Sequence, residues 1–253
     1  MKRRINTVVL AVSAWSATCM AETDAVHFTD ERVSIDGVAA ESAWQQAEWR
    51  SLDKHILGEY PGPRDFAGRY KLLWDAERLY LLAEITDDVL FDQHADPLLR
   101  YWDDDCLEIF IDEDASGGNH QFSYNAFAYH IALDNQAVDI GSQLEDESPE
   151  FVLLNEHVES QWRRQPDQPH TVVWEVAIKI FDDTFEPDAG SAPLTLAAGK
   201  TMGFMLAYCD NDGSAEREHF VGSHDIVPVH GDKNLGYIDA DVFGEIRLSP
   251  PID

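Results

Sequence analysis

Apolar side chains recur at every second position along several short stretches of this chain. The pattern is clearest in residues 80–86, 107–112 and 174–180. Successive side chains of a β-strand point to opposite faces of a sheet, so a period of two predicts strands with one buried face. Less regular versions of the pattern predict further strands at residues 70–74, 121–129, 130–139, 203–209 and 245–248.

Helical patterns are rare by comparison. One short helix is predicted near the N-terminus at residues 41–48, with Trp44 turned inward, and no long stretch has the 3.6-residue period of an amphipathic helix. Turn-forming pairs such as Asp36-Gly37 and Asp212-Gly213 separate the predicted strands. This organisation disfavours a βαβ sheet and predicts an all-β fold, a two-sheet antiparallel β-sandwich of the jelly-roll kind.

The composition fits one folded domain and limits its partners. Of the 253 residues, 44% are hydrophobic, which is enough for one hydrophobic core. There are 48 acidic but only 18 basic residues, so the net charge is −30. Such a charge repels nucleic-acid phosphates and anionic membranes, so we expect no nucleic acid as a partner and no membrane insertion of the folded domain.

The first residues have the pattern of an export signal. Three basic residues precede a short, mostly apolar segment at residues 5–20, and small residues come before a cleavage position after Ala21. We therefore predict a signal peptide at residues 1–21 and a single domain at residues 22–253, located in the periplasm or outside the cell. An alternative is a lipoprotein anchored through Cys19.

Cleavage would leave two cysteines, Cys106 and Cys209, and a net charge of −33. Two thiols in an oxidising compartment can form a disulfide. The alternative is two separate thiols buried in strands, so the pairing stays open at this point.

Motifs of the common catalytic and cofactor sites are absent from the sequence. We find no GxSxG, HExxH, CxxC, Walker or dinucleotide glycine pattern, and therefore expect no organic cofactor. His219, His224 and His230 lack the spacing of metal ligands on a helix, and we interpret them as solvated loop residues. With so many acidic residues, carboxylate pairs alone do not identify a glycosidase site.

An ordered set of short motifs resembles the family 9 carbohydrate-binding modules. The motifs extend over nearly all of the predicted domain, in the order Ile35-Asp36-Gly37, Ala43-Trp44, Leu73-Trp74-Asp75, Leu79-Tyr80, Trp102 with Asp105, Leu107-Glu108-Ile109-Phe110-Ile111-Asp112 and Phe243-Gly244-Glu245-Ile246-Arg247-Leu248. The resemblance implies a two-sheet β-sandwich related to the DOMON fold. It also implies binding of sugars, typically at glycan chain ends, and structural calcium.

The resemblance further implies two aromatic rings that hold a sugar between them. Trp102 takes the place of the first ring, just before the strand predicted at residues 107–112. Tyr237 takes the place of the second, where the family pattern has a larger Trp. The alternative is that both rings have only structural roles, Trp102 as an ordinary core residue and Tyr237 as a residue that packs within a loop.

Five polar residues match, or stand in for, the ligand contacts of the family. They are Glu108, Gln121, Ser123, Asn125 and Asn234, with Ser123 at the position of a family Arg. On a strand at 121–129, Gln121, Ser123 and Asn125 would share one face. Amides suit sugar hydroxyls, because each hydroxyl both donates and accepts hydrogen bonds. Alternatively, Glu108 is a solvated strand residue and the other three belong to an outer face of the sandwich.

A run of oxygen ligands suggests where calcium would bind. Asp210 and Asp212 are the calcium candidates in the turn Asp210-Asn211-Asp212-Gly213, and Asp103–Asp105 form a similar acidic run. Calcium takes 6–8 hard oxygen ligands and tolerates irregular loops. The alternative is a solvated acidic loop on a very acidic protein.

These observations lead to one main hypothesis and two alternatives. The main hypothesis is a secreted, non-catalytic carbohydrate-binding protein that clamps a mono- or oligosaccharide, such as a chain end of xylan or cellulose. A separate glycan-degrading enzyme is its expected partner. One alternative is a haem-binding DOMON-type domain, with axial ligands drawn from Met202, Met205, His130 and His219. The other is a glycoside hydrolase.

Overall fold

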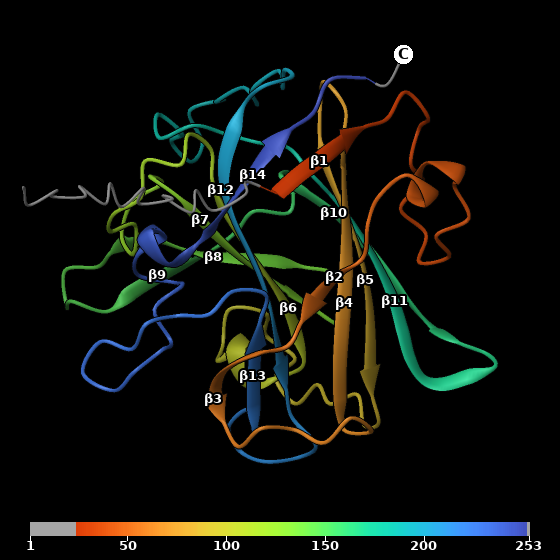
Figure 1. The fold of residues 1–253 in the computed structure, drawn as a ribbon. Coiled ribbons are helices and arrows are strands. Elements are labelled where there is room, and N and C mark those ends of the chain that lie inside the picture. The colour runs from red at the N-terminus through yellow and green to blue at the C-terminus, as the bar shows by residue number, and fades with distance from the viewer. Residues whose placement is uncertain (1–23, 252–253) are drawn as a thin grey trace, which may run out of the picture.

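The computed structural model describes residues 24–251, whose regular secondary structure consists of β-strands and three short 3₁₀ turns (Figure 1). One sheet contains, in order, β10 (Val158–Gln165), β11 (Gln168–Ile178), β5 (Leu79–Asp87), β4 (Phe66–Trp74) and the short β2 (Arg50–Leu52). The second sheet contains β14 (Gly244–Leu248), β12 (Thr201–Asp210), β6 (Cys106–Asp112), β7 (Phe127–Ala132), β8 (Ala137–Gln143) and β9 (Pro149–Leu153). Two further strands, β13 (His219–Gly222) and β3 (Lys54–Gly58), extend the second sheet beside the end of β12.

Strand β1 (Asp24–Phe28) joins the two sheets. Its residues 24–26 pair in parallel with β14, and its residues 27–28 pair in parallel with β4. All other pairs of strands in the described part of the chain are antiparallel. The predicted two-sheet β-sandwich is confirmed, although β1 pairs in parallel with a strand of each sheet where antiparallel pairing was predicted.

The main core follows the predicted alternation. Leu107, Ile109 and Ile111 of β6 are at most 1% exposed and pack in the core with residues of both sheets. Burying one such aliphatic side chain contributes about 1.5–3 kcal/mol. Cys106 and Phe110, on the opposite face of β6, belong to a second set of buried residues that we call the outer cluster. Its members are Ile56, Cys106, Phe110, Ala128, Met205, Ala207, Cys209, Phe220 and Ile226.

The predicted strand at residues 121–129 is wrong over most of its length. Residues 121–126 form turns and bends, and the strand begins only at Phe127. The backbone N–H of Ser123 donates to the carbonyl of His120 at 3.0 Å, which closes a tight turn. This local turn replaces the extended backbone that the side-chain pattern suggested.

The predicted strand at residues 130–139 is two strands joined by a turn. Strand β7 ends at Ala132 and β8 begins at Ala137. Between them, Asn135 has a left-handed φ of 66°. The Asp134 carboxylate accepts a hydrogen bond from the backbone N–H of Gln136 at 2.9 Å, a side-chain interaction typical of turns.

The predicted helix at residues 41–48 is only a 3₁₀ turn, η1 (Ser42–Gln45). Trp44 does point inward as predicted and is 3% exposed. Its indole N–H donates to the Glu175 carboxylate at 3.1 Å, which ties this turn to strand β11.

The predicted signal peptide, its cleavage after Ala21 and the alternative anchor at Cys19 lie outside the described residues. Within residues 24–251, no helix is long and apolar enough to cross a membrane.

Candidate functional site

A pocket of about 390 Å³ opens on the face of the second sheet that is turned away from the main core. Five of the seven residues predicted to contact a sugar line this pocket: Trp102, Glu108, Gln121, Asn234 and Tyr237. They come from four separate segments of the chain, so their meeting is a property of the fold and not of local sequence.

Each segment brings its residue to the pocket in a different way. Trp102 lies in η2 (Tyr101–Asp103), a 3₁₀ turn that leads into β6, and Glu108 lies within β6 itself. Gln121 belongs to the turns between β6 and β7. Asn234 and Tyr237 lie on the long loop between β13 and β14. Their loop position places them over the face of the second sheet.

The structure does not bring Ser123 and Asn125 into the pocket. Ser123 is exposed. The amide nitrogen of Asn125 donates to the carbonyl of Gly117 at 2.8 Å, which secures the connection between β6 and β7. Both placements follow from the turns at residues 121–126, because the strand geometry that would have aligned these side chains with Gln121 does not form there.

One wall of the pocket is aromatic. The rings of Tyr101 and Trp102 lie 5.0 Å apart, edge to face, and the rings of Trp102 and Phe151 lie 5.7 Å apart. Trp102 is half-buried and lies outside the core clusters, which contradicts the interpretation of Trp102 as an ordinary core residue. Phe151 of β9 was not predicted, because β9 has no regular alternation that would mark it.

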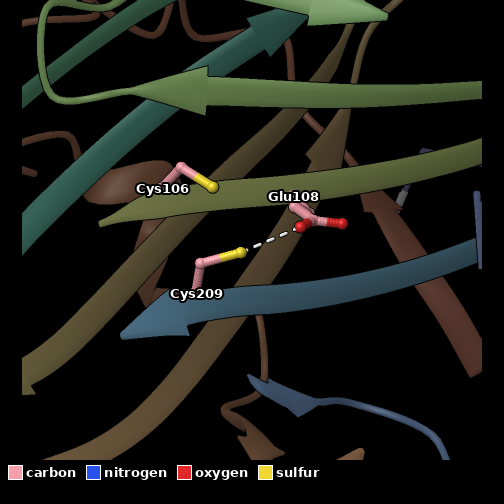
Figure 2. A group of neighbouring side chains, drawn as sticks. All are labelled: Cys106, Glu108 and Cys209. Carbon is pink, nitrogen blue, oxygen red and sulfur yellow. Dashed lines mark hydrogen bonds between the residues drawn. The ribbon is translucent and has the colours of Figure 1, made fainter. Parts of the chain in front are cut away.

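Glu108 lies at the floor of the pocket and is only 2% exposed, so its interpretation as a solvated strand residue is wrong. One of its carboxylate oxygens, Oε1, lies 2.8 Å from Nε2 of His130 and 3.0 Å from Nη1 of Arg217. The thiol of Cys209 donates to the same oxygen at 2.9 Å (Figure 2). Burial raises the pKa of Glu108, but His130 and Arg217 outweigh it, and the pKa lies below its ordinary value.

Asp139 of β8 is a second carboxyl group in the pocket, and it was not predicted. It is 4% exposed. Its two oxygens accept hydrogen bonds from the backbone N–H groups of Ala128 at 3.1 Å and Ile140 at 2.7 Å. Burial raises the pKa of Asp139 to about 7.

The raised pKa of Asp139 predicts a stability that depends on pH. The group stabilises the fold fully below its unfolded pKa of about 4, and this contribution is lost as the pH rises through the folded pKa. We expect the unfolding free energy of the wild type, relative to that of Asp139→Asn, to fall by roughly 2–3 kcal/mol between about pH 5 and pH 8. Urea unfolding of both proteins across this range measures the difference. Parallel curves would contradict the assignment.

A cluster of three acidic residues lies where the ends of β5, β6 and β12 meet. Asp87, Asp105 and Asp210 are at most 2% exposed, and one carboxylate oxygen from each lies within 4.8 Å of the others. Burial raises the pKa of the three groups to about 6, 9 and 8 respectively, and Asp87 adds repulsion for the other two. Oδ1 of Asp87 is buried without a hydrogen-bond partner. A cation that takes hard oxygen ligands fits this arrangement, because it would neutralise the charges and coordinate the unpartnered oxygen.

The two predicted calcium candidates therefore lie in different surroundings. Asp210 belongs to the buried group described above. Asp212 is exposed and lies near Asp65 and Asp88. Because Asp210 and Asp212 are close in sequence, one calcium site in a single turn was predicted. In the structure, Asp210 is the last residue of β12 and is buried, whereas Asp212 lies beyond the strand and is exposed.

The residues considered as haem ligands are engaged elsewhere. Met202 packs in the main core and Met205 in the outer cluster, so they point to opposite sides of β12. The ring nitrogens of His130 lie near Glu108 and the carbonyl of Ala128. Those of His219 lie near Asp65 and the carbonyl of Glu59.

Solved structures with the same fold include two from Caldicellulosiruptor kristjanssonii, both of a family 9 carbohydrate-binding module. The complex with cellotriose has a TM-score of 0.64 at 20% identity and covers 92% of this chain and 96% of that one. The complex with glucose has a TM-score of 0.63 at 20% identity and covers 91% and 98%. At this level of identity the likeness establishes the fold.

Two comparisons of sequence point to the same family. The chain is 38% identical over 90 residues to endo-1,4-beta-xylanase A of Thermotoga neapolitana. This match spans 36% of the chain and only 8% of the xylanase. The profile of the family described as "Carbohydrate family 9 binding domain-like" matches residues 35–250. The chain therefore belongs to this family.

Proposed function

We propose that the pocket beside Trp102 binds a gluco-configured oligosaccharide, such as the end of a cellulose or xylan chain, and holds one sugar unit between Trp102 and Tyr237. The observation that supports this most directly is the convergence of five predicted contact residues, from four segments, on a single pocket. The related modules bind cellotriose and glucose. The relative found by sequence is an endo-1,4-beta-xylanase.

The chemistry of the pocket suits a neutral sugar. The C–H face of a pyranose is apolar and packs against an aromatic ring such as Trp102. The hydroxyl groups at its edge need both donors and acceptors. The amides of Gln121 and Asn234 offer both, and the carboxylate of Glu108 adds a charged acceptor.

The pocket carboxyl groups favour binding over hydrolysis. A glycosidase needs one carboxyl group that gives a proton and one that attacks or activates water. Oε1 of Glu108 is already held by three donors, and both oxygens of Asp139 accept backbone hydrogen bonds. Asp139 has the raised pKa of a proton donor, but its oxygens are held by the backbone of β7 and β8, as Oε1 of Glu108 is held by its three neighbours. We therefore propose a module that binds without catalysis, which an assay for reducing sugars released from cellulose and xylan fragments tests.

Titration calorimetry with purified protein tests the proposed ligand. We expect cellotriose and cellobiose to bind. Comparison of both with glucose measures how much each added sugar unit contributes to the affinity, and xylobiose tests whether a xylan end also binds. Galactose serves as the control, because its axial hydroxyl changes the edge of the ring that faces the polar residues. No heat of binding with any of these sugars would contradict the proposal.

We also propose that Asp87, Asp105 and Asp210 hold a structural calcium ion. The argument rests on the three buried carboxylates and on the unpartnered Oδ1 of Asp87. When bound, calcium would neutralise the cluster and join the ends of β5, β6 and β12. None of these residues lines the sugar pocket, so the ion is proposed to support the fold and not to contact the ligand.

Removing calcium is expected to lower the melting temperature. A ligand at 100 times its Kd stabilises the native state by about 2.7 kcal/mol, or roughly 5–10 °C for a domain of this size. Differential scanning calorimetry with calcium and with excess chelator measures the shift. Asp105→Asn should remove the response to calcium, whereas Asp212→Asn should keep it. The reverse pattern would place the ion in the exposed group around Asp212.

We further propose that the protein is exported and acts beside a separate glycan-degrading enzyme. The basic and apolar start of the chain supports export, and family 9 domains are typically extracellular. Cell fractionation followed by N-terminal sequencing tests this proposal. A mature chain that begins at Glu22 is expected, and a lipid-modified Cys19 would replace this proposal with a membrane-anchored form.

A further inference from the structure

Cys106 and Cys209 lie directly opposite each other in neighbouring strands. They are register partners in the antiparallel pair of β6 and β12. Opposed residues of such a pair have Cα atoms about 4.5–5.5 Å apart, within the range of about 4.4–6.8 Å that disulfides require. Both side chains lie on the Glu108 side of the sheet (Figure 2). The structure has them as free thiols, with their sulfur atoms within 4.8 Å of each other.

We propose that Cys106 and Cys209 form a disulfide across β6 and β12, and that this bond frees one oxygen of Glu108, Oε1, to accept a second hydrogen bond from the sugar. This second part rests on the proposed function of the pocket. Both thiols are 0% exposed, and they are the only cysteines after residue 21. Neither has another thiol with which it could pair inside the folded domain.

The bond forms by exchange with an external disulfide, either of a thiol oxidoreductase or of oxidised glutathione. One cysteine thiolate attacks the external disulfide and forms a mixed disulfide, and the second thiolate then displaces the remaining external thiol. The two protein thiols are oxidised, one S–S bond forms, and the external disulfide is reduced to two thiols that take up the two protons. Because both sulfur atoms are buried in the fold, exchange takes place while the chain folds in an oxidising compartment.

The consequence for the pocket follows from the contacts of Glu108. Oε1 accepts from the thiol of Cys209 and also faces Arg217 and His130. A carboxylate oxygen has two lone pairs, so three protein donors leave Oε1 little acceptor capacity for a ligand, whereas none of the three contacts the second oxygen, Oε2. A disulfide has no S–H proton, so Oε1 loses its contact with Cys209 and keeps the other two.

Peptide mapping decides whether the bond exists. The full chain is produced with export into an oxidising compartment, alkylated in denaturant without reductant, and digested. We expect one linked pair of peptides that contains Cys106 and Cys209. Alkylation of both cysteines would overturn the proposal. So would one equivalent of zinc released on denaturation, because the sulfur atoms would then be metal ligands.

Affinity measurements decide the link to the sugar. Cys106→Ala cannot form the bond but keeps the thiol of Cys209 beside Glu108, so it represents the reduced state without added reductant. We expect exported wild type to bind cellotriose roughly 2- to 10-fold more tightly than this variant. Because the bond is buried, wild type refolded from denaturant in the presence of reductant should have the affinity of Cys106→Ala, and the same treatment should leave the variant unchanged. Equal affinities would overturn the link to Glu108. If neither protein binds sugar, the proposed function fails, while the mapped bond stands.

Discussion

Replacing Trp102 with alanine is expected to abolish measurable sugar binding while the protein remains folded. Trp102 is half-buried on the pocket wall and contacts the rings of Tyr101 and Phe151. A buried aromatic anchor in a binding site contributes at least about 2 kcal/mol, or roughly 30-fold in affinity. Starting from weak sugar binding, such a loss places the Kd beyond the range of titration calorimetry. The loss of stability should be modest, because the ring is outside the core clusters.

Two variants separate a specific effect from general damage. Trp102→Phe keeps an aromatic ring and should retain part of the affinity. Trp49→Ala removes another partly exposed indole, which lies near the first sheet under Arg69 and Lys71, and should leave binding unchanged. Circular dichroism checks the fold of each variant. If Trp102→Ala unfolds the protein, the ring supports the fold and the proposed clamp loses its first member.

The strands were predictable from the sequence wherever one face of a strand lies in the main core. Leu107, Ile109 and Ile111 alternate in the sequence because β6 is buried between two different environments. The strand prediction failed at residues 121–126, where the chain forms turns. Polar and apolar side chains alternate there as they would on a strand, but backbone hydrogen bonds close turns instead. The parallel pairing of β1 depends on strands near positions 74 and 246, far away in the sequence.

Only those residues of the site could be predicted that the strand period or the family resemblance identifies. The period of two correctly placed Glu108 opposite Leu107 and Ile109. It could not reveal Arg217, which approaches Glu108 across 109 positions of sequence. Nor could it reveal Asp139, whose importance comes from its burial and not from its neighbours along the chain.

Glu108→Gln is expected to reduce both the stability of the protein and its affinity for the sugar. From the sequence alone, the substitution should weaken binding with little loss of stability. The structure changes this expectation, because the side chains of Glu108 and Arg217 are only 3% and 9% exposed and form an ion pair at 3.0 Å. Removing one partner leaves the other charge buried and unpaired, which typically costs about 3–5 kcal/mol.

The stability part of this prediction is measured by urea unfolding. Glu245→Gln, on an exposed position of β14, is the matched control and should change the unfolding free energy by less than about 0.5 kcal/mol. The double variant Glu108→Gln with Arg217→Met should recover part of the loss, because it no longer buries an unpaired guanidinium. A single variant as stable as the wild type would show that Arg217 finds another partner.

The pH dependence provides an independent check on the charge of Glu108. Its folded pKa is lowered, so its stabilising contribution is present above the unfolded pKa of about 4.3 and is lost as the pH falls through the folded value. The difference in unfolding free energy between wild type and Glu108→Gln should therefore be constant near neutral pH and shrink in acid. At neutral pH, the affinity of Glu108→Gln for the sugar should be roughly 10- to 100-fold lower than that of the wild type. This is the effect of losing one charged hydrogen bond of about 1.5–3 kcal/mol. An affinity equal to that of the wild type would remove Glu108 from the sugar site. In that case, Glu108 would serve only to neutralise Arg217 beneath the pocket.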